Sequence, residues 1–127
     1  NFKLKTSNIL QGVGMYVYEK LRSNKVLINP PQGGFYLMPE FINKKYKTSS
    51  DLCVAILKET GVALLPGSAF GFKPNKMLAR LSFTDFDGSN FLKNIASKNN
   101  INKSDVEKYA PNVVAGAKIL SNWAKKL

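Results

Sequence analysis

Two neighbouring stretches decide the fold of this chain: ETGVALLPGSAFG at residues 59–71 and MLARLSFT at residues 77–84. In the first, the apolar run 62–65 has the length of a buried strand, and Pro66 and Gly67 stop it. The second follows a loop rich in glycine, proline and lysine, and is another strand-like run that contains Arg80. These stretches predict two strands separated by a loop.

Upstream of these strands, the pattern predicts a helix and two more strands. Residues 8–22 carry apolar side chains every four residues, which is typical of one face of an amphipathic helix. Glycines within this stretch weaken the helix, since each costs up to about 1 kcal/mol relative to alanine. The runs 25–28 and 33–39 are strand-like and are bounded by glycine or proline. The apolar stripe and the glycines are Ile9, Val13, Val17 and Leu21, and Gly12 and Gly14.

Three more helices are predicted from their ends. Residues 49–51 supply an N-cap for a helix whose inner face is formed by Leu52, Cys53, Ile56 and Leu57, and Gly61 stands where a left-handed C′ residue is needed. Residues 87–89 open a helix that ends before a polar loop at 98–103. Ser104 and Glu107 have the spacing of a capping box, and Pro111 suits the first turn of the last helix.

The predicted order is helix, strand, strand, helix, strand, strand, helix, helix. This order is typical of an α+β fold, with a small, mostly antiparallel sheet covered by helices. The 127 residues fit one domain, and no internal boundary or repeat is visible.

The charge is strongly positive, but its distribution does not favour a nucleic-acid interface. The net charge is +11, and seventeen of the nineteen basic residues are lysines without any run longer than two. Dedicated phosphate-binding faces more often cluster arginine and lysine with aromatic residues. We therefore expect a solvated surface and no nucleic-acid partner, with a basic standalone binding module as an alternative.

The remaining composition indicates which kinds of site and which cellular compartment to expect. The chain has no histidine, the commonest general base and metal ligand, so no metal site is expected. Its one cysteine, Cys53, excludes an internal disulfide and favours a reducing, cytoplasmic setting. No apolar run approaches the length of a membrane span, so no membrane partner is expected.

Three segments, in this order and separation, resemble the C-terminal small domain of class I/II pyridoxal-phosphate-dependent aminotransferases of the aspartate aminotransferase type. They are PQGGFYLMP at 31–39, ETGVALLPGSAFG at 59–71 and LARLSF at 78–83. The resemblance implies the small-domain fold of fold-type I transferases. Residues 1–127 would form that small domain, residues 1–24 would be the end of an interdomain helix, and the large cofactor-binding domain would be absent.

The resemblance also implies a site. Arg80 matches the arginine that clamps the substrate α-carboxylate, although a structural salt bridge is the alternative. Gly34, together with Gly33, would lie near the active-site mouth, where missing side chains permit close approach of backbone; an ordinary strand-entry turn is the alternative. Ser68 resembles a nucleophile, but the chain contains no histidine to activate it.

Other conspicuous side chains have structural explanations. We expect Cys53 and Trp123 to be packing residues. Asp85 and Asp87 could be paired acids, yet the Gly88-Ser89-Asn90 that follows favours helix capping.

The implied cofactor is pyridoxal phosphate, held in such enzymes by a large-domain lysine, an aspartate and a phosphate cup. None of the seventeen lysines here has a context resembling that lysine's motif. The implied substrates are an amino acid, aspartate-like, and a 2-oxo acid, and the implied assembly of the whole enzyme is a homodimer. We expect no catalytic residue here and an inactive chain on its own. An aminotransferase-like fold with a different pyridoxal-phosphate reaction is the alternative.

Overall fold

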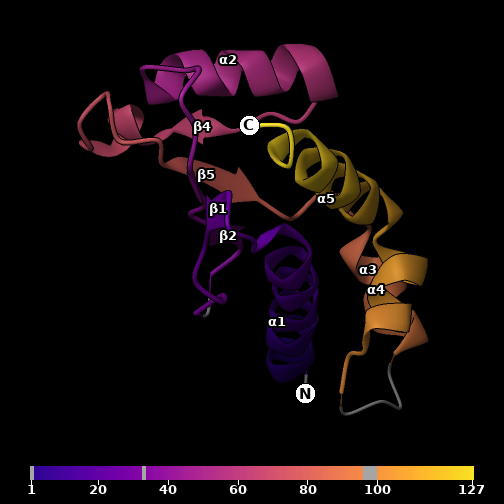
Figure 1. Ribbon diagram of the computed structural model, residues 1–127. Coiled ribbons are helices and arrows are strands. Elements are labelled where there is room, and N and C mark those ends of the chain that lie inside the picture. The colour runs from indigo at the N-terminus through magenta and orange to yellow at the C-terminus, as the bar shows by residue number, and fades with distance from the viewer. Residues whose placement is uncertain (1, 33, 96–99) are drawn as a thin grey trace.

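The computed structural model describes residues 2–32, 34–95 and 100–127. The helices are α1 (Phe2–Leu21), α2 (Ser49–Thr60), the 3₁₀ helix η1 (Gly67–Phe70), α3 (Gly88–Asn94), α4 (Lys103–Tyr109) and α5 (Pro111–Ala124). The strands are β1 (Val26–Leu27), β2 (Tyr36–Leu37), β3 (Glu40–Phe41), β4 (Leu65–Pro66) and β5 (Ala79–Ser82). Along the chain, α1 is followed by three short strands, α2, two more strands with η1 between them, and three helices (Figure 1).

The main sheet has three antiparallel strands in the order β2-β5-β4. Tyr36 pairs with Ser82 in one ladder, and Leu65 pairs with Arg80 in the other. Beyond β2, the backbone continues alongside β5, since the Phe41 nitrogen donates to the Met77 oxygen at 2.8 Å. β3 also pairs with β1 in a second, two-stranded sheet. The predicted α+β class with a small antiparallel sheet is therefore confirmed.

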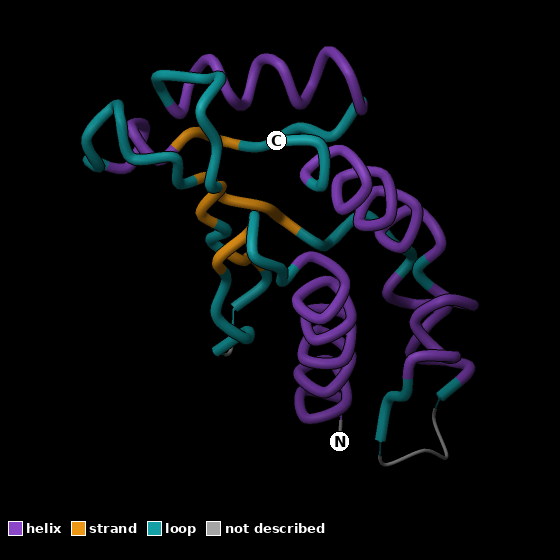
Figure 2. The backbone as a smooth tube through the Cα atoms, viewed as in Figure 1, coloured by secondary structure: helices purple, strands orange, loops and turns teal. Residues whose placement is uncertain are grey.

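Helices pack around the strands, which lie centrally between α2 and α1 (Figure 2). α2 contacts β4 and α5, whereas α1 contacts β2, α3, α4 and α5. Most of the buried apolar side chains form one cluster that extends from α1 through the sheet to α5. Within the described ranges, no helix is both long enough and apolar enough to cross a membrane.

The predicted stripe on α1 is confirmed, because Ile9, Val13, Val17 and Leu21 are all buried. The two glycines of this helix have a packing role that the sequence did not reveal. A Cβ on Gly12 would lie 2.7 Å from Ile101, and a Cβ on Gly14 would lie 2.9 Å from the Phe83 ring. These glycines therefore lower the helix propensity of α1 but allow Ile101 and Phe83 to pack closely against it.

Several predicted boundaries are wrong. Of the run 62–65 only Leu65 is in a strand, and β4 includes Pro66, which an edge strand tolerates because its backbone nitrogen need not donate. The predicted strand 33–39 shrinks to β2. Its last residue, Pro39, does not end the pairing, because its oxygen accepts from the Ala79 nitrogen at 3.0 Å and β3 follows directly. The predicted strand 25–28 shrinks to β1.

The helix ends differ from prediction in three places. Thr48, not residues 49–51, caps α2, because its hydroxyl accepts from the Asp51 nitrogen at 3.1 Å. The capping box of α4 joins Asn102 and Asp105, not Ser104 and Glu107, because the helix begins at Lys103, inside the predicted loop. Residues 98 and 99 of that loop lie outside the described residues.

Other predicted ends are confirmed. Gly61 is left-handed with φ 79° after α2, Asp87 caps α3, and Pro111 begins α5. One member of the predicted α2 face is wrong: Leu57 is 52% exposed, because the buried stripe comprises only Ser49, Leu52, Cys53 and Ile56.

Candidate functional site

Strand β5 presents Arg80 on the face of the sheet that points away from the core. The strand alternates between buried and more exposed residues, with Ala79 and Leu81 buried. Because successive side chains of a strand point to opposite faces, Arg80 and Ser82 share the outer face. Leu65 pairs with Arg80 from β4 and is exposed on the same face.

Two aromatic rings hold the Arg80 guanidinium. Its Cζ lies 4.4 Å from the ring centroid of Phe70 and 5.2 Å from that of Tyr36. Tyr36 in turn makes an edge-to-face contact with Phe35, with the ring centroids 6.1 Å apart. The arginine is therefore half-buried among aromatic side chains rather than projecting freely into solvent.

No carboxylate among the described residues neutralises Arg80. Among the residues that the structure describes, which include all eight acidic side chains, Arg80 forms no salt bridge and its side chain donates no hydrogen bond. The structural salt bridge weighed from the sequence is thus not formed here. A positively charged group with open donors, beside apolar rings, can bind a carboxylate from outside the chain.

Gly34 lies next to this arginine site but is not required by the packing of the chain. A Cβ on Gly34 would meet Tyr36 at 3.8 Å, which is ordinary contact. Sterics at this position therefore do not require a glycine. Gly33, the other glycine of the pair, lies outside the described residues.

The segment from β4 through η1 brings Phe70 to the arginine. The Gly67 nitrogen donates to the Leu78 oxygen at 2.7 Å, which docks the start of η1 on the strand that leads to Arg80. Gly71 ends the turn with φ 92°. Ser68 lies in a cluster of hydroxyls, 3.4 Å from the Oγ atoms of both Ser49 and Ser50.

The other conspicuous side chains have structural roles. Cys53 is buried in the core, and burial raises the pKa of its thiol to about 11. Trp123 stacks on Tyr46 with ring centroids 6.1 Å apart, and its Nε1 donates to Glu59 at 3.3 Å. Asp87 accepts from the Asn90 nitrogen at 3.0 Å as the cap of α3, as predicted, whereas Asp85 is exposed.

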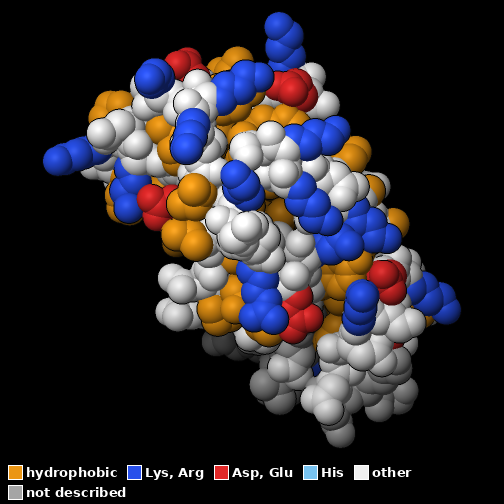
Figure 3. Space-filling model, viewed as in Figure 1, with side chains coloured by type: hydrophobic (Ala, Val, Ile, Leu, Met, Phe, Trp, Pro, Cys, Tyr) orange, Lys and Arg blue, Asp and Glu red, His pale blue; other side chains and the backbone are white. Residues whose placement is uncertain are grey.

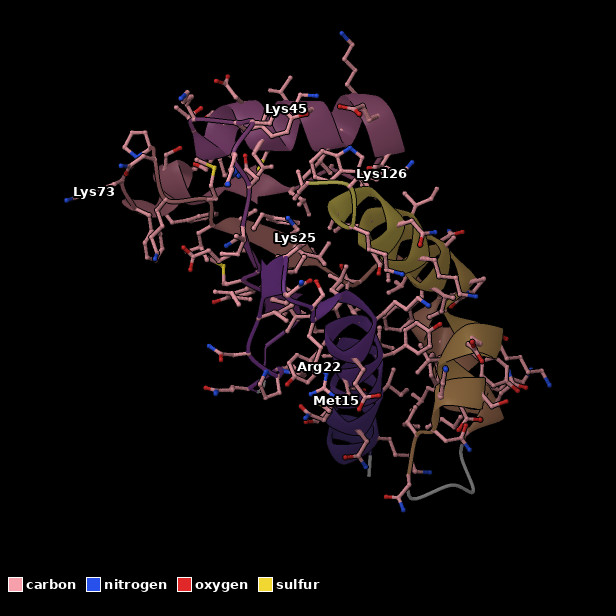
Figure 4. All side chains as sticks on the ribbon, viewed as in Figure 1. Met15, Arg22, Lys25, Lys45, Lys73 and Lys126 are labelled. Carbon is pink, nitrogen blue, oxygen red and sulfur yellow. The ribbon has the colours of Figure 1, made fainter. Side chains whose placement is uncertain are left out.

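The described residues do not fit a pyridoxal phosphate site. Every described lysine whose side chain is placed is at least partly exposed, and Figure 4 shows Lys73 projecting away from the body of the molecule. The cavity of about 350 Å³ between α5 and β5 has no lysine in its lining, and the cavity of about 700 Å³ beside α1 is lined by Lys20 and Lys103, which are both exposed to solvent. No group of three potential metal ligands occurs among the described residues.

Basic side chains are spread over the face seen in Figure 3, interrupted by other residues rather than gathered in one patch. Tyr36 and Phe70 were not predicted as site residues from the sequence. Tyr36 lies in the stretch 31–39 and Phe70 in the stretch 59–71, so their position in these stretches could have indicated a place near the site.

Comparison with known proteins finds aminotransferases. The chain is 35% identical over 71 residues to an aspartate aminotransferase of Sulfolobus acidocaldarius, covering 53% of this chain and 18% of that protein. It is 44% identical over 55 residues to a probable N-acetyl-LL-diaminopimelate aminotransferase of Bacillus subtilis, covering 43% and 14%. It is 32% identical over 71 residues to an aspartate aminotransferase of Sulfurisphaera tokodaii, covering 53% and 18%.

The matched stretch thus spans less than a fifth of each of these relatives and about half of this chain. No protein-family profile matches the chain. The resemblance to aminotransferases stated from the three segments is confirmed by these relatives, each of which is matched over only a small part of its length.

Proposed function

We propose that this chain is the small domain of a longer pyridoxal-phosphate-dependent aminotransferase, and that Arg80 binds the α-carboxylate of its amino-acid and 2-oxo-acid substrates. The observation that carries the proposal is an arginine on the outer face of β5 that lacks any carboxylate partner among the described residues. The names of the three relatives support the aminotransferase class.

The chemistry of guanidinium suits the proposed role. It is planar, stays charged at any working pH and offers paired donors that match both oxygens of a carboxylate. The α-carboxylate is common to an amino acid and the corresponding 2-oxo acid, so one arginine can orient both substrates. Fixing the carboxylate aligns the rest of the substrate for reaction and reduces the entropy that the chemical step must lose.

Chemistry at the amino group would belong to the rest of the longer protein. The described residues do not fit the cofactor, so we assign its chemistry to the rest of the longer protein. Two of the relatives are named aspartate aminotransferases, which supports an aspartate-like donor. The homodimer and the closure of the small domain over bound substrate are likewise proposals for the whole enzyme.

The test is an amino-transfer assay with the complete protein. Aspartate, alanine and an aromatic amino acid serve as donors with a panel of 2-oxo acids, and new amino acid is measured by chromatography. We expect transfer with at least one donor, and fastest with aspartate. Cofactor-dependent consumption of an amino acid without any transfer would instead support a different pyridoxal-phosphate reaction on this fold.

A second measurement tests whether the cofactor site lies outside this chain. Pyridoxal phosphate titrated into the 127-residue chain should give only nonspecific adducts with surface lysines. A saturable, one-to-one absorbance band that disappears on replacing one lysine would contradict the placement of the cofactor site outside this chain.

A further inference from the structure

We propose that Phe70 and Tyr36 are positioning residues that hold the Arg80 guanidinium ready for a carboxylate, and that Gly67 fixes the place of Phe70. The inference rests on the proposed function because it concerns the same arginine. It adds the residues that prepare the arginine in the absence of ligand.

The two rings reach Arg80 from different parts of the fold. Tyr36 pairs with Ser82, so it lies diagonally across from Arg80 on the same face of the sheet. Phe70 ends η1, which directly follows the strand that pairs with Arg80 on its other side. Arg80 therefore lies between the Tyr36 ring from β2 and the Phe70 ring from the turn that follows β4.

This placement addresses the main weakness of arginine as a ligand-binding group. A free arginine side chain has about 2 kcal/mol of rotamer entropy, some of which is lost when it binds. The rings at 4.4 and 5.2 Å restrict the side chain before a ligand arrives. Preorganisation of this kind raises affinity by lowering the entropy lost on binding.

The aromatic contacts also leave the donors of Arg80 available. Guanidinium can stack its flat face on a ring while its N–H groups, which lie in its plane, still point to a carboxylate. An internal salt bridge would occupy these donors instead, and no described carboxylate does so. The rings thus hold the cation in place without neutralising it.

Gly67 explains why Phe70 is at the right place. A Cβ on Gly67 would lie 2.8 Å from the Leu78 oxygen and 3.1 Å from the Leu78 Cβ, and the first of these atoms belongs to the backbone. Only a residue without a side chain lets η1 dock this closely beside β5. At the other end of the turn, the Phe72 nitrogen donates to the Gly67 oxygen at 3.2 Å. This hydrogen bond closes the turn that contains Phe70.

The experiment follows the arginine side chains of the 127-residue chain by NMR during titration with sodium acetate, at a concentration at which sedimentation velocity shows the chain to be monomeric. The chain has only two arginines, so each Nε–H signal can be assigned by removing the other. Arg22 is the internal control, since it is exposed and lies 5.4 Å from a single ring, Tyr18. Phe70→Leu removes the ring, Phe70→Tyr keeps it, and Phe72→Leu is the matched control. Phe70 and Phe72 are both 40% exposed, and Phe72 makes no described ring contact with Arg80.

We expect acetate to shift the Arg80 signal, and Phe70→Leu to weaken that binding about two- to tenfold, the range that corresponds to the entropy of ordering one side chain on binding. Phe70→Tyr should restore the affinity, and Phe72→Leu should leave it unchanged. If Phe70→Leu disturbs the backbone amide spectrum, Tyr36→Leu provides the same test from the other ring.

Unchanged acetate affinity in a folded Phe70→Leu chain would overturn the proposal, as would an equal loss in Phe72→Leu. A wild-type Arg80 signal that does not respond to acetate would also overturn it. The measurement needs no catalysis, so its result is independent of the amino-transfer assay. If the complete protein transfers amino groups but Phe70→Leu leaves the acetate affinity unchanged, only the positioning role is refuted. If Phe70→Leu weakens acetate binding but the complete protein transfers no amino group, only the aminotransferase function is refuted.

Discussion

Single glycines of this chain differ sharply in what surrounds them. Gly67 leaves no room for a Cβ beside the backbone of Leu78, whereas nothing lies within 4 Å of the place where a Cβ on Gly88 would stand. Neither has a left-handed φ. The pair therefore separates the effect of packing from the effect of backbone freedom.

Gly67→Ala should destabilise the chain by about 1–3 kcal/mol, the usual range for forcing an extra carbon into a packed site. Urea unfolding measured by circular dichroism gives the free energy of unfolding. Gly88→Ala is the control and should change it by less than about 1 kcal/mol, in the stabilising direction. Equal effects of the two substitutions would contradict the close docking of η1 on β5.

Cys53 gives the folded chain a defined sensitivity to alkaline pH. Its thiol pKa is raised from 9.0 to about 11 by burial, so the unfolded chain loses this proton first. The thiol's contribution to stability is complete below about pH 9 and declines as the pH rises toward 11. The stability advantage of the wild type over Cys53→Ala should therefore shrink between pH 9 and 11.

This prediction is checked by urea unfolding of both proteins at pH 8, 9, 10 and 11. Tyr16 also has a raised pKa, because of its burial and the nearby Glu107 carboxylate, but it is present in both proteins and cancels in the difference. A difference in unfolding free energy that stays constant from pH 8 to 11 would refute the buried, neutral thiol.

At the scale of elements, the start of α4 is the sharpest disagreement between pattern and structure. Asn102→Ala should destabilise the chain by about 1 kcal/mol, because it removes the acceptor for the Asp105 nitrogen at 2.9 Å. Ser104→Ala, at the cap that the sequence pattern favoured, should have an effect within about 0.5 kcal/mol. Thermal unfolding of the two variants decides between the two caps, and a larger loss for Ser104→Ala would favour the sequence pattern.

Elements with a long apolar period were predictable from the sequence. The stripe of Ile9, Val13, Val17 and Leu21 located α1, because a repeated spacing of four residues is a strong local signal. Gly61 and Pro111 marked helix ends correctly for the same reason, since each has a local conformational preference.

The parts that could not be predicted depend on contacts between distant segments. β3 is a two-residue strand whose existence depends on pairing with β1, and Pro39 made it look like a loop. β4 was predicted at 62–65, but its bounds depend on pairing with β5, and Pro66 was wrongly expected to stop it. Gly12 and Gly14 read as weak helix positions because Ile101 and Phe83 lie far away in sequence. Arg80 was predicted as a site residue through its motif, but the rings beside it became visible only with the register of the sheet.

At the scale of the whole molecule, the arginine site belongs to a wider apolar surface. Phe35, Tyr36, Leu65 and Phe70 are all at least 40% exposed, and pairing and ring contacts place them around Arg80. Contiguous apolar surface of this kind usually meets another domain or a ligand. We propose that this surface forms the mouth of the site in the longer protein.

The isolated chain should therefore self-associate through this surface. Sedimentation velocity at rising concentration should show an average mass above 14.1 kDa. The double substitution Phe35→Ser and Leu65→Ser should reduce the association, while Ile119→Ser, at a comparably exposed position on α5, should not. A strictly monomeric wild-type chain at high concentration would contradict this assignment.

The most direct measurement of the central claim is the amino-transfer kcat/KM of the complete protein with Arg80→Ala. Loss of one partner from a hydrogen-bonded charge pair typically costs about 2–5 kcal/mol, so we expect a fall of roughly 30- to 5,000-fold. Arg22→Ala, at the chain's other arginine, should stay within about twofold of the wild type, as expected for an exposed side chain outside the site. If Arg80→Ala retains the activity of Arg22→Ala, then Arg80 does not hold the substrate carboxylate and the account is wrong.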